Sequence, residues 1–287
     1  MTLIPNHRPE PVENITQLIT FLVRERGLTE ADLQRVVECQ RAQELNLSEA
    51  LLQLGMVTQA DLVAARGLRT EPPAAAVGVA SQSMLFVRDP FHPVSEQVRG
   101  LRTELLRRQP DKLHNRIAIV SANKGDGRSR LAAALAMACA QMDQATLLVD
   151  ADLRMPTQHE LFGLPRGPGL ADTLERGVAP QVMGVQGLPK LAVLTAGKLV
   201  NNPLELLCSR PFADLLDSWR RSYRHVIVDT AAAERGADAT AVASAAGGVV
   251  VLSRLDHSGL PACAELLKRL RGAQVSMLGS VVLKAAM

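Results

Sequence analysis

Three aspartates, each at the end of a short apolar segment, are the side chains of this chain best suited to hold a metal ion. Asp150 and Asp152 close the segment 145–152, and Asp229 closes the segment 224–229. Residues two apart on an extended strand share one face, so the first two carboxylates can point toward a single ion. Carboxylate oxygens are good ligands for Mg²⁺, and the pattern therefore predicts a Mg²⁺ site. The alternative is that these acids only cap helices or turns.

A second group of residues has the spacing of a phosphate-binding loop. That pattern reads Ala or Gly, four residues, Gly, Lys, and then Ser or Thr, and residues 122–129 match it except that Arg128 replaces the lysine. The backbone N–H groups of such a loop and the N-terminus of the following helix attract phosphate. The candidate nucleotide-binding residues are Ala122, Asn123, Lys124, Gly125, Asp126, Gly127, Arg128, Ser129 and Arg130.

Two side chains of this loop could act on the nucleotide directly. Arg128 keeps the positive charge of the missing lysine, but its planar guanidinium is wider than an ammonium. Ser129 falls where the loop hydroxyl binds Mg²⁺. The loop therefore predicts binding of a Mg²⁺–nucleotide complex, and the alternative is an ordinary strand–turn–helix junction with chance glycines.

The elements around these residues must bring them together. Apolar strands are expected near 116–121, 145–150, 191–195, 224–229, 248–253 and 275–283, and helical segments alternate with them. This alternation is typical of α/β proteins with a doubly wound, mostly parallel sheet, as in P-loop nucleotide-binding proteins and partition ATPases. Such sheets bind ligands at the carboxyl ends of their strands, where the loop and the aspartates are expected to meet.

Composition narrows the remaining possibilities. The chain has 287 residues, of which 47% are apolar and 2% aromatic, and its net charge is +3. This length suggests two domains, and this charge does not indicate nucleic acid as a partner. The four cysteines are far apart and lack metal-ligand spacing, as expected for reduced thiols in the cytoplasm. No apolar run reaches the ~18 residues of a membrane span, so any membrane association is expected to depend on a partner.

The domain boundaries follow from changes in pattern along the chain. Residues 1–68 are expected to form a small all-α domain. Residues 69–84 are rich in Pro, Ala and Ser without periodicity, which indicates a linker. Residues 85–287 contain the phosphate loop and the aspartates, and are expected to form the nucleotide-binding domain.

The N-terminal domain contains a weak internal repeat. Thr29 and Asp32 recur as Thr58 and Asp61, and each pair fits the capping pattern of a helix start. The region resembles the N-terminal domain of type II secretion and pilus-assembly ATPases, which implies a docking module. A helical cap with no ligand of its own is the alternative.

The larger domain resembles the bacterial tyrosine kinases. Segments 169–174 and 202–207 are similar to the G-L-x-x-x-L and N-P-x-E-L-L segments of that family. The two-aspartate strand is similar to its second Walker motif, and Asp229 to its Walker B acid. Arg128 and the N-terminal domain look like the exopolysaccharide chain-length-determinant kinases of the EpsG type within that family.

A helix expected at 93–108 carries a further motif of the family. Glu96, Arg99 and Arg102 have the spacing E-x-x-R-x-x-R, which is similar to the self-association motif of these kinases. The resemblance implies that this helix joins copies of the chain into a homo-oligomer. From spacing alone, the alternative is a solvated helix face with local ion pairs.

The resemblance implies an ATP- and Mg²⁺-dependent phosphotransferase that acts on tyrosine. Arg128, Asp150 and Asp152 would be the catalytic residues, with Arg128 clamping the phosphates and Asp150 acting as base or orienter for the attacking hydroxyl. Ser129, Asp152 and Asp229 would hold Mg²⁺. The partner would be a membrane chain-length-determinant protein, whose cytoplasmic segment would switch the kinase on at the inner face of the plasma membrane.

Two departures from the family pattern leave the activity open. Family members usually end in a tyrosine-rich tail, whereas this chain holds one tyrosine, Tyr223, and residues 231–233 are alanines where the family often has prolines. Three functions remain: a kinase acting on another protein, a nucleotide-gated regulator of polysaccharide assembly, and a partition- or positioning-type ATPase. Lys124 lies one place later than the signature lysine of the last class, which argues against it.

Overall fold

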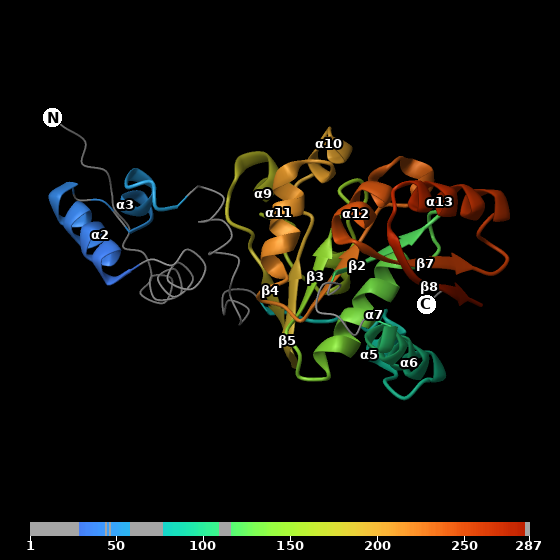
Figure 1. Cartoon of the computed structure of the whole chain (residues 1–287). Helices are drawn as coiled ribbons and strands as arrows, with labels where there is room; N and C mark the ends of the chain where they lie inside the picture. The colour runs from blue at the N-terminus through green and yellow to red at the C-terminus, as the bar shows by residue number, and fades with distance from the viewer. Residues whose placement is uncertain (1–28, 44, 46, 58–76, 109–115, 285–287) are drawn as a thin grey trace. The chain divides into compact units, whose positions relative to one another are not determined.

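The structure is a computed structural model that describes residues 29–43, 45, 47–57, 77–108 and 116–284 (Figure 1). The chain divides into two compact units, Met1–Leu68 and Arg69–Met287. The second copy of the predicted repeat and the first part of the predicted linker lie outside the described residues.

The described part of the first unit contains two helices, α2 (Glu30–Gln43) and α3 (Leu47–Gln53). The capping pattern expected before the first helix is confirmed. The Asp32 carboxylate accepts a hydrogen bond from the Thr29 N–H at 3.0 Å, and the Asp32 N–H donates to the Thr29 hydroxyl oxygen at 3.3 Å. The apolar core of this unit contains Val36, Leu47, Ala50, Leu51 and Val57.

The second unit is built on one eight-stranded sheet with the strand order β1-β4-β5-β3-β6-β2-β7-β8. The strands are β1 (Val77–Gly78), β2 (Arg116–Ser121), β3 (Thr146–Asp150), β4 (Met183–Val185), β5 (Leu188–Leu194), β6 (His225–Asp229), β7 (Gly248–Arg254) and β8 (Ser276–Leu283). All neighbouring strands are parallel except β4 and β5. The six strands predicted from the sequence are confirmed, as is the mostly parallel α/β fold.

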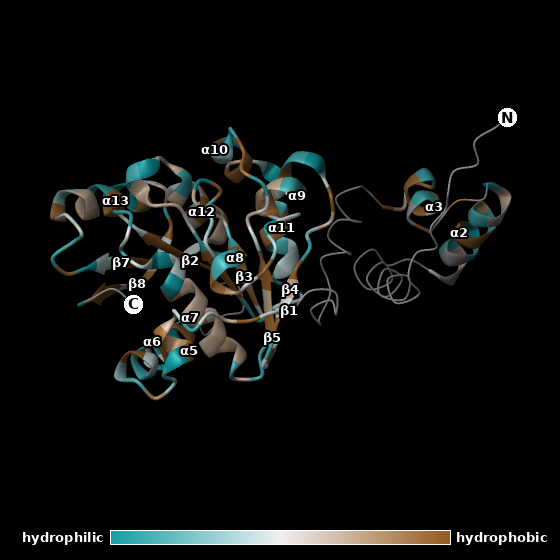
Figure 2. Ribbon diagram, turned by 180° about the vertical axis from the view of Figure 1, so that it is seen from behind, coloured by the Kyte–Doolittle hydropathy of each residue, from teal (hydrophilic) through white to brown (hydrophobic). Residues whose placement is uncertain are grey.

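Helices cover both faces of this sheet (Figure 1). One face carries α7 (Arg128–Ala140), with α5 (Leu85–Arg88) and α6 (Pro93–Arg108) outside it, and the other carries α11 (Arg210–Trp219), α12 (Asp238–Ala246) and α13 (Leu260–Gly272). Short helices α8 (Gln158–Leu161), α9 (Leu170–Arg176) and α10 (Pro203–Leu207) lie in the connections. The strands are the most apolar layer (Figure 2). None of the helices in the described ranges is long and apolar enough to cross a lipid bilayer.

The alanine-rich helix α7 lies at the centre of the packing. Every residue from 131 to 140 is buried, and the helix packs on β2, β3, β5 and β6. Small alanine side chains let the helix approach the sheet closely on one side and α6 on the other. This packing fixes the N-terminus of α7, where the phosphate loop ends.

Residues 77–84 belong to the second unit, and the prediction of a linker as far as Met84 was wrong at this end. Strand β1 pairs with β4, and Gly78 lies opposite Val185. A Cβ atom at Gly78 would lie 2.3 Å from the carbonyl oxygen of Phe162, so only glycine fits this approach. The sequence gives no sign of β1 and β4 because strands this short carry no periodicity.

Candidate active site

Parallel pairing places the predicted site residues at one edge of the sheet. Strands β3 and β6 are neighbours, and Asp150 lies opposite Asp229 in their register. Strand β2 lies on the other side of β6, and the loop 122–127 leads from its carboxyl end into α7. The phosphate loop and the aspartates therefore meet at the carboxyl ends of three adjacent strands, as the fold prediction requires.

The phosphate loop has the backbone that its glycines predict. Gly125 and Gly127 have φ angles of +83° and +101°, a region that other residues rarely adopt. Inside the loop, the Asp126 carboxylate accepts hydrogen bonds from the Asn123 N–H at 3.0 Å and from the Ser258 hydroxyl at 2.7 Å. Asp126 therefore ties the loop to the segment that follows β7, and its side chain is buried away from the cavity.

Glu234, in the short helix η2 (Ala233–Arg235) after β6, braces the loop from the other side. Its carboxylate accepts hydrogen bonds from the Asn123 side-chain amide at 3.0 Å and from the Lys124 N–H at 2.8 Å. The Glu234 N–H donates to the carbonyl oxygen of Ala122 at 3.0 Å. The bonds from Asn123 and Lys124 lower the pKa of Glu234. No motif in the sequence marks this residue.

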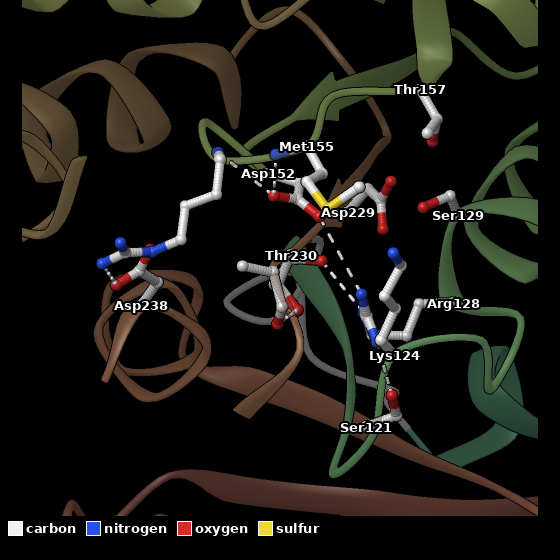
Figure 3. A network of polar contacts seen from close by, with 12 residues as sticks. Ser121, Lys124, Arg128, Ser129, Asp152, Met155, Thr157, Asp229, Thr230 and Asp238 are labelled. Carbon is white, nitrogen blue, oxygen red and sulfur yellow. Dashed lines mark hydrogen bonds and ion pairs between the residues drawn. The ribbon is translucent and has the colours of Figure 1, made fainter. Parts of the chain in front are cut away.

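Arg128 is turned into the protein rather than toward solvent, and it is only 7% exposed (Figure 3). Its Nε donates to the Thr230 carbonyl oxygen at 2.9 Å, and its Nη1 donates to the Ser121 hydroxyl at 2.6 Å and to the Asn123 carbonyl oxygen at 3.1 Å. Its Nη2 lies 3.9 Å from Oδ2 of Asp152. The guanidinium therefore links the loop to the ends of β2 and β6.

Asp229 has one carboxylate oxygen that fits a metal ion. The residue is fully buried, and its Oδ2 accepts a hydrogen bond from the Gln158 side-chain amide at 2.8 Å. Its Oδ1 is buried with no hydrogen-bond partner among the described residues. The Ser129 hydroxyl points toward this carboxylate (Figure 3). Burial raises the pKa of Asp229 to about 6, and a nearby cation would relieve that cost.

Asp150 and Asp152 differ in their surroundings. Asp150 is fully buried and accepts hydrogen bonds from the N–H groups of Asp152 at 3.2 Å, Thr157 at 3.1 Å and Gln158 at 3.0 Å. Burial, and then the charge of Asp229, raise the pKa of Asp150. Asp150 therefore holds the loop between β3 and α8, whereas Asp152 lines the cavity.

A cavity of about 340 Å³ opens in front of these groups. The predicted residues that line it are Lys124, Gly125, Gly127, Arg128, Ser129, Arg130 and Asp152. Lining residues that sequence reasoning missed are Met155, Thr157, Glu160, Leu161 and Arg235. Four of the lining side chains are cationic, which suits a polyphosphate ligand.

The oxygen atoms at this cavity suit Mg²⁺ more than a transition metal, because they come from a hydroxyl and carboxylates. The described residues contain no cage of three or more His, Cys, Asp or Glu side chains. A Mg²⁺ ion held by Ser129, Asp152 and Asp229 would take its remaining ligands from phosphate oxygens and water, as Mg²⁺ does in phosphotransfer sites.

The helix predicted at 93–108 is confirmed as α6, and its three motif residues make contacts within their own chain. Arg99 pairs with Glu96 and lies over the Phe86 ring at 5.2 Å. Nη1 of Arg102 donates to the carbonyl oxygen of Ala138, near the C-terminus of α7, at 2.8 Å. The Glu96 side chain is 60% exposed. The role of this helix in self-association stays a prediction.

The chain is similar in sequence to several known proteins. No family model matches the chain. EpsB of Ralstonia nicotianae, which carries a tyrosine-protein kinase name, is 34% identical over 202 residues, or 70% of this chain and 27% of that protein. The tyrosine-protein kinase YwqD of Bacillus subtilis is 31% identical over 202 residues, which cover 70% of this chain and 85% of YwqD.

Solved structures agree with the sequence comparison. The chimerical protein CapA2B2 superposes with a TM-score of 0.67 and 31% identity, covering 80% of this chain and all of that one. The kinase domain of the Escherichia coli tyrosine kinase ETK gives a TM-score of 0.65 and 29% identity over 71% of this chain and 82% of that one. This chain therefore belongs to the family of bacterial tyrosine-protein kinases.

Proposed function

We propose that the chain binds ATP with Mg²⁺ and transfers the γ-phosphate to a tyrosine of another protein, in the control of exopolysaccharide chain length and export. The observation that supports this proposal is the buried Oδ1 of Asp229, which has no hydrogen-bond partner among the described residues and which the Ser129 hydroxyl of the phosphate loop faces. The names of the relatives support the reaction class. The chain spans 27% of EpsB, so the activity of that whole protein is not carried over by similarity alone.

Each group of residues at the site would have its own role in phosphotransfer. The loop N–H groups and the N-terminus of α7 would hold the phosphates. Ser129, Asp152 and Asp229 would hold Mg²⁺, which when bound neutralises charge on the β- and γ-phosphates. Asp152, which lines the cavity, would also accept the proton of an attacking hydroxyl, in place of the predicted base Asp150. Asp150, buried behind it, would orient the loop that carries Asp152.

The acceptor must come from elsewhere. Tyr223, the one tyrosine of the chain, is 3% exposed and precedes β6, so the folded chain does not offer it to a second active site. We propose that the acceptor lies on a membrane chain-length-determinant protein, whose cytoplasmic segment brings this chain to the inner face of the plasma membrane. Helix α6 would join copies of the chain in the same assembly.

The burial of Tyr223 also favours a second candidate function. A nucleotide-gated regulator of polysaccharide assembly would need the same ATP and Mg²⁺ site but no tyrosine acceptor. Its output would be an altered contact with the partner, driven by binding or slow hydrolysis of ATP.

Incubation of the full chain with γ-labelled ATP and Mg²⁺ separates the two functions. The reaction would be run with and without the cytoplasmic segment of the membrane partner, and both protein label and free phosphate would be scored. We expect label on the partner segment. Free phosphate without protein label would support the regulator instead. Neither signal, in a chain that binds ATP, would contradict the kinase and leave a regulator driven by nucleotide binding.

A further inference from the structure

The phosphate loop contains two candidate cations for the nucleotide, and the structure gives them different roles. We propose that Lys124, and not Arg128, is the side chain that binds the terminal phosphates of the nucleotide. Arg128 occupies the position of the usual loop lysine, but would act as a brace for the loop. This inference rests on the nucleotide binding proposed above and names the residue that provides its charge.

The Arg128 side chain donates its hydrogen bonds to acceptors within the protein. Its Nε and Nη1 make three hydrogen bonds, to the Thr230 carbonyl, the Ser121 hydroxyl and the Asn123 carbonyl. To reach a phosphate with these atoms, the guanidinium would have to leave buried acceptors unpaired, which is costly. The remaining nitrogen, Nη2, faces Asp152. The planar fork of arginine suits this bracing role, which a single ammonium could not fill.

The side chain of Lys124 differs from that of Arg128 in its exposure and in its contacts. The residue is exposed and lines the cavity. Within the part of the chain that the structure describes, its ammonium makes no hydrogen bond or ion pair, and Figure 3 shows its nitrogen pointing toward Asp229 and Ser129. A lysine on a flexible four-carbon stem can follow a phosphate group that arrives with Mg²⁺ at those residues. Its charge is therefore both available and correctly placed.

The backbone of Lys124 is held by a hydrogen bond, although its ammonium has no partner within the described ranges. Its N–H donates to Oε1 of Glu234 at 2.8 Å, and the other oxygen of Glu234 accepts from Asn123. Glu234 is thus a positioning residue, which keeps Lys124 at the rim of the cavity. Arg235, which follows Glu234 in the chain, also lines the cavity and adds positive charge to it.

The test measures MgATP affinity of the full chain by calorimetry, together with the unfolding temperature without nucleotide. For Lys124→Met we expect at least a tenfold loss of affinity and an unchanged unfolding temperature. The control is Lys190→Met, an exposed lysine on β5 that is absent from the cavity lining, for which we expect wild-type affinity. Wild-type affinity in Lys124→Met would overturn the proposal.

Arg128→Lys gives an independent result. A bracing role predicts a lower unfolding temperature, because lysine cannot replace all three hydrogen bonds, and no recovery of affinity when combined with Lys124→Met. If the new lysine at 128 restored tight binding to the double variant, position 128 would be the phosphate-binding one and the proposal would be wrong. Failure of the wild-type chain to bind MgATP would instead remove the proposed function itself.

Discussion

At the scale of single residues, the site holds carboxyl groups in the protein interior, where a negative charge loses its hydration. Asp150 and Asp229 are fully buried and lie opposite each other on neighbouring strands. Burial raises the pKa of both carboxyl groups. Groups held against their solvation preference are typical of functional sites, because a ligand of opposite charge recovers the cost.

The variant Asp229→Asn should separate stability from function. An amide can still accept the hydrogen bond from Gln158, and it removes a buried negative charge. We expect the free energy of unfolding without nucleotide to rise by about 1–3 kcal/mol at neutral pH, since that charge is desolvated in the folded state. Mg²⁺-dependent binding of ATP should be lost, because the free Oδ1 is replaced by an amide nitrogen.

The control for this variant is Asp214→Asn, at a 49% exposed carboxylate that pairs with the exposed Arg210 on α11. Its effect on the free energy of unfolding should stay within about 1 kcal/mol, as for other surface ion pairs, and its MgATP affinity should be that of the wild type. Chemical denaturation and calorimetry on the two variants give both quantities. A destabilised Asp229→Asn variant that still bound MgATP would contradict the assigned role of Asp229.

His225, at the start of β6, predicts a pH dependence of stability far from the cavity. It is buried and hydrogen-bonded to Gln144, and burial lowers its pKa to about 4. Below pH 6.5 the unfolded chain takes up a proton at this residue, whereas the folded chain does so only near pH 4. The contribution of His225 to stability is therefore lost as the pH falls through this window, by on the order of 3 kcal/mol.

The variant His225→Gln removes that proton uptake. Between pH 6.5 and 4.5, its free energy of unfolding should fall less steeply than that of the wild type, whatever its value at neutral pH. Denaturant unfolding of both proteins at several pH values measures the difference. Parallel curves would show that His225 does not titrate differently in the folded and unfolded chains.

At the scale of elements, strand β1 lies so close to neighbouring backbone that residue 78 has no room for a side chain. Gly78 in β1 faces the Phe162 carbonyl oxygen, and a Cβ atom there would also lie 2.6 Å from Cδ2 of Leu164. Gly78→Ala should therefore cost about 1–3 kcal/mol, the usual range for an overpacked site.

Gly100 offers a matched control with the opposite sign. It lies on an exposed turn of α6, and no heavy atom would lie within 4 Å of an added Cβ. Gly100→Ala should stabilise the second unit by about 0.5–1 kcal/mol, because alanine favours the helix. Denaturant unfolding compares the two variants. Equal stabilities would show that β1 is not held in the arrangement described.

At the scale of the whole molecule, the sequence predicts what depends on local pattern. Parallel strands buried on both faces are continuous apolar runs, which is why β2, β3, β6 and β7 could be located. The phosphate loop and the carboxylates after the strands follow fixed spacings, and the fold brings them together. Strand β1, at one edge of the sheet, and its neighbour β4 have three residues or fewer, which is too short for a recognisable sequence pattern.

The contacts that decide the chemistry could not be predicted in the same way. Gln158 and Glu234 are single polar residues in connecting segments, and they reach the site only because distant parts of the chain fold together. The direction of the Arg128 side chain depends on Thr230 and Ser121, which accept its hydrogen bonds. These two residues lie at the ends of β6 and β2. The spacing of the loop motif shows that a cation is present, but not where its side chain points.

Binding of MgATP to the full chain is the measurement that tests this account most directly. Calorimetric titration with ATP would be done in excess Mg²⁺ and again in excess chelator, at neutral pH. We expect one site per chain in Mg²⁺ and binding at least tenfold weaker in chelator, because in the proposed site Ser129, Asp152 and Asp229 would hold the nucleotide through the ion. Absence of binding in Mg²⁺, or equal affinity under both conditions, would contradict it.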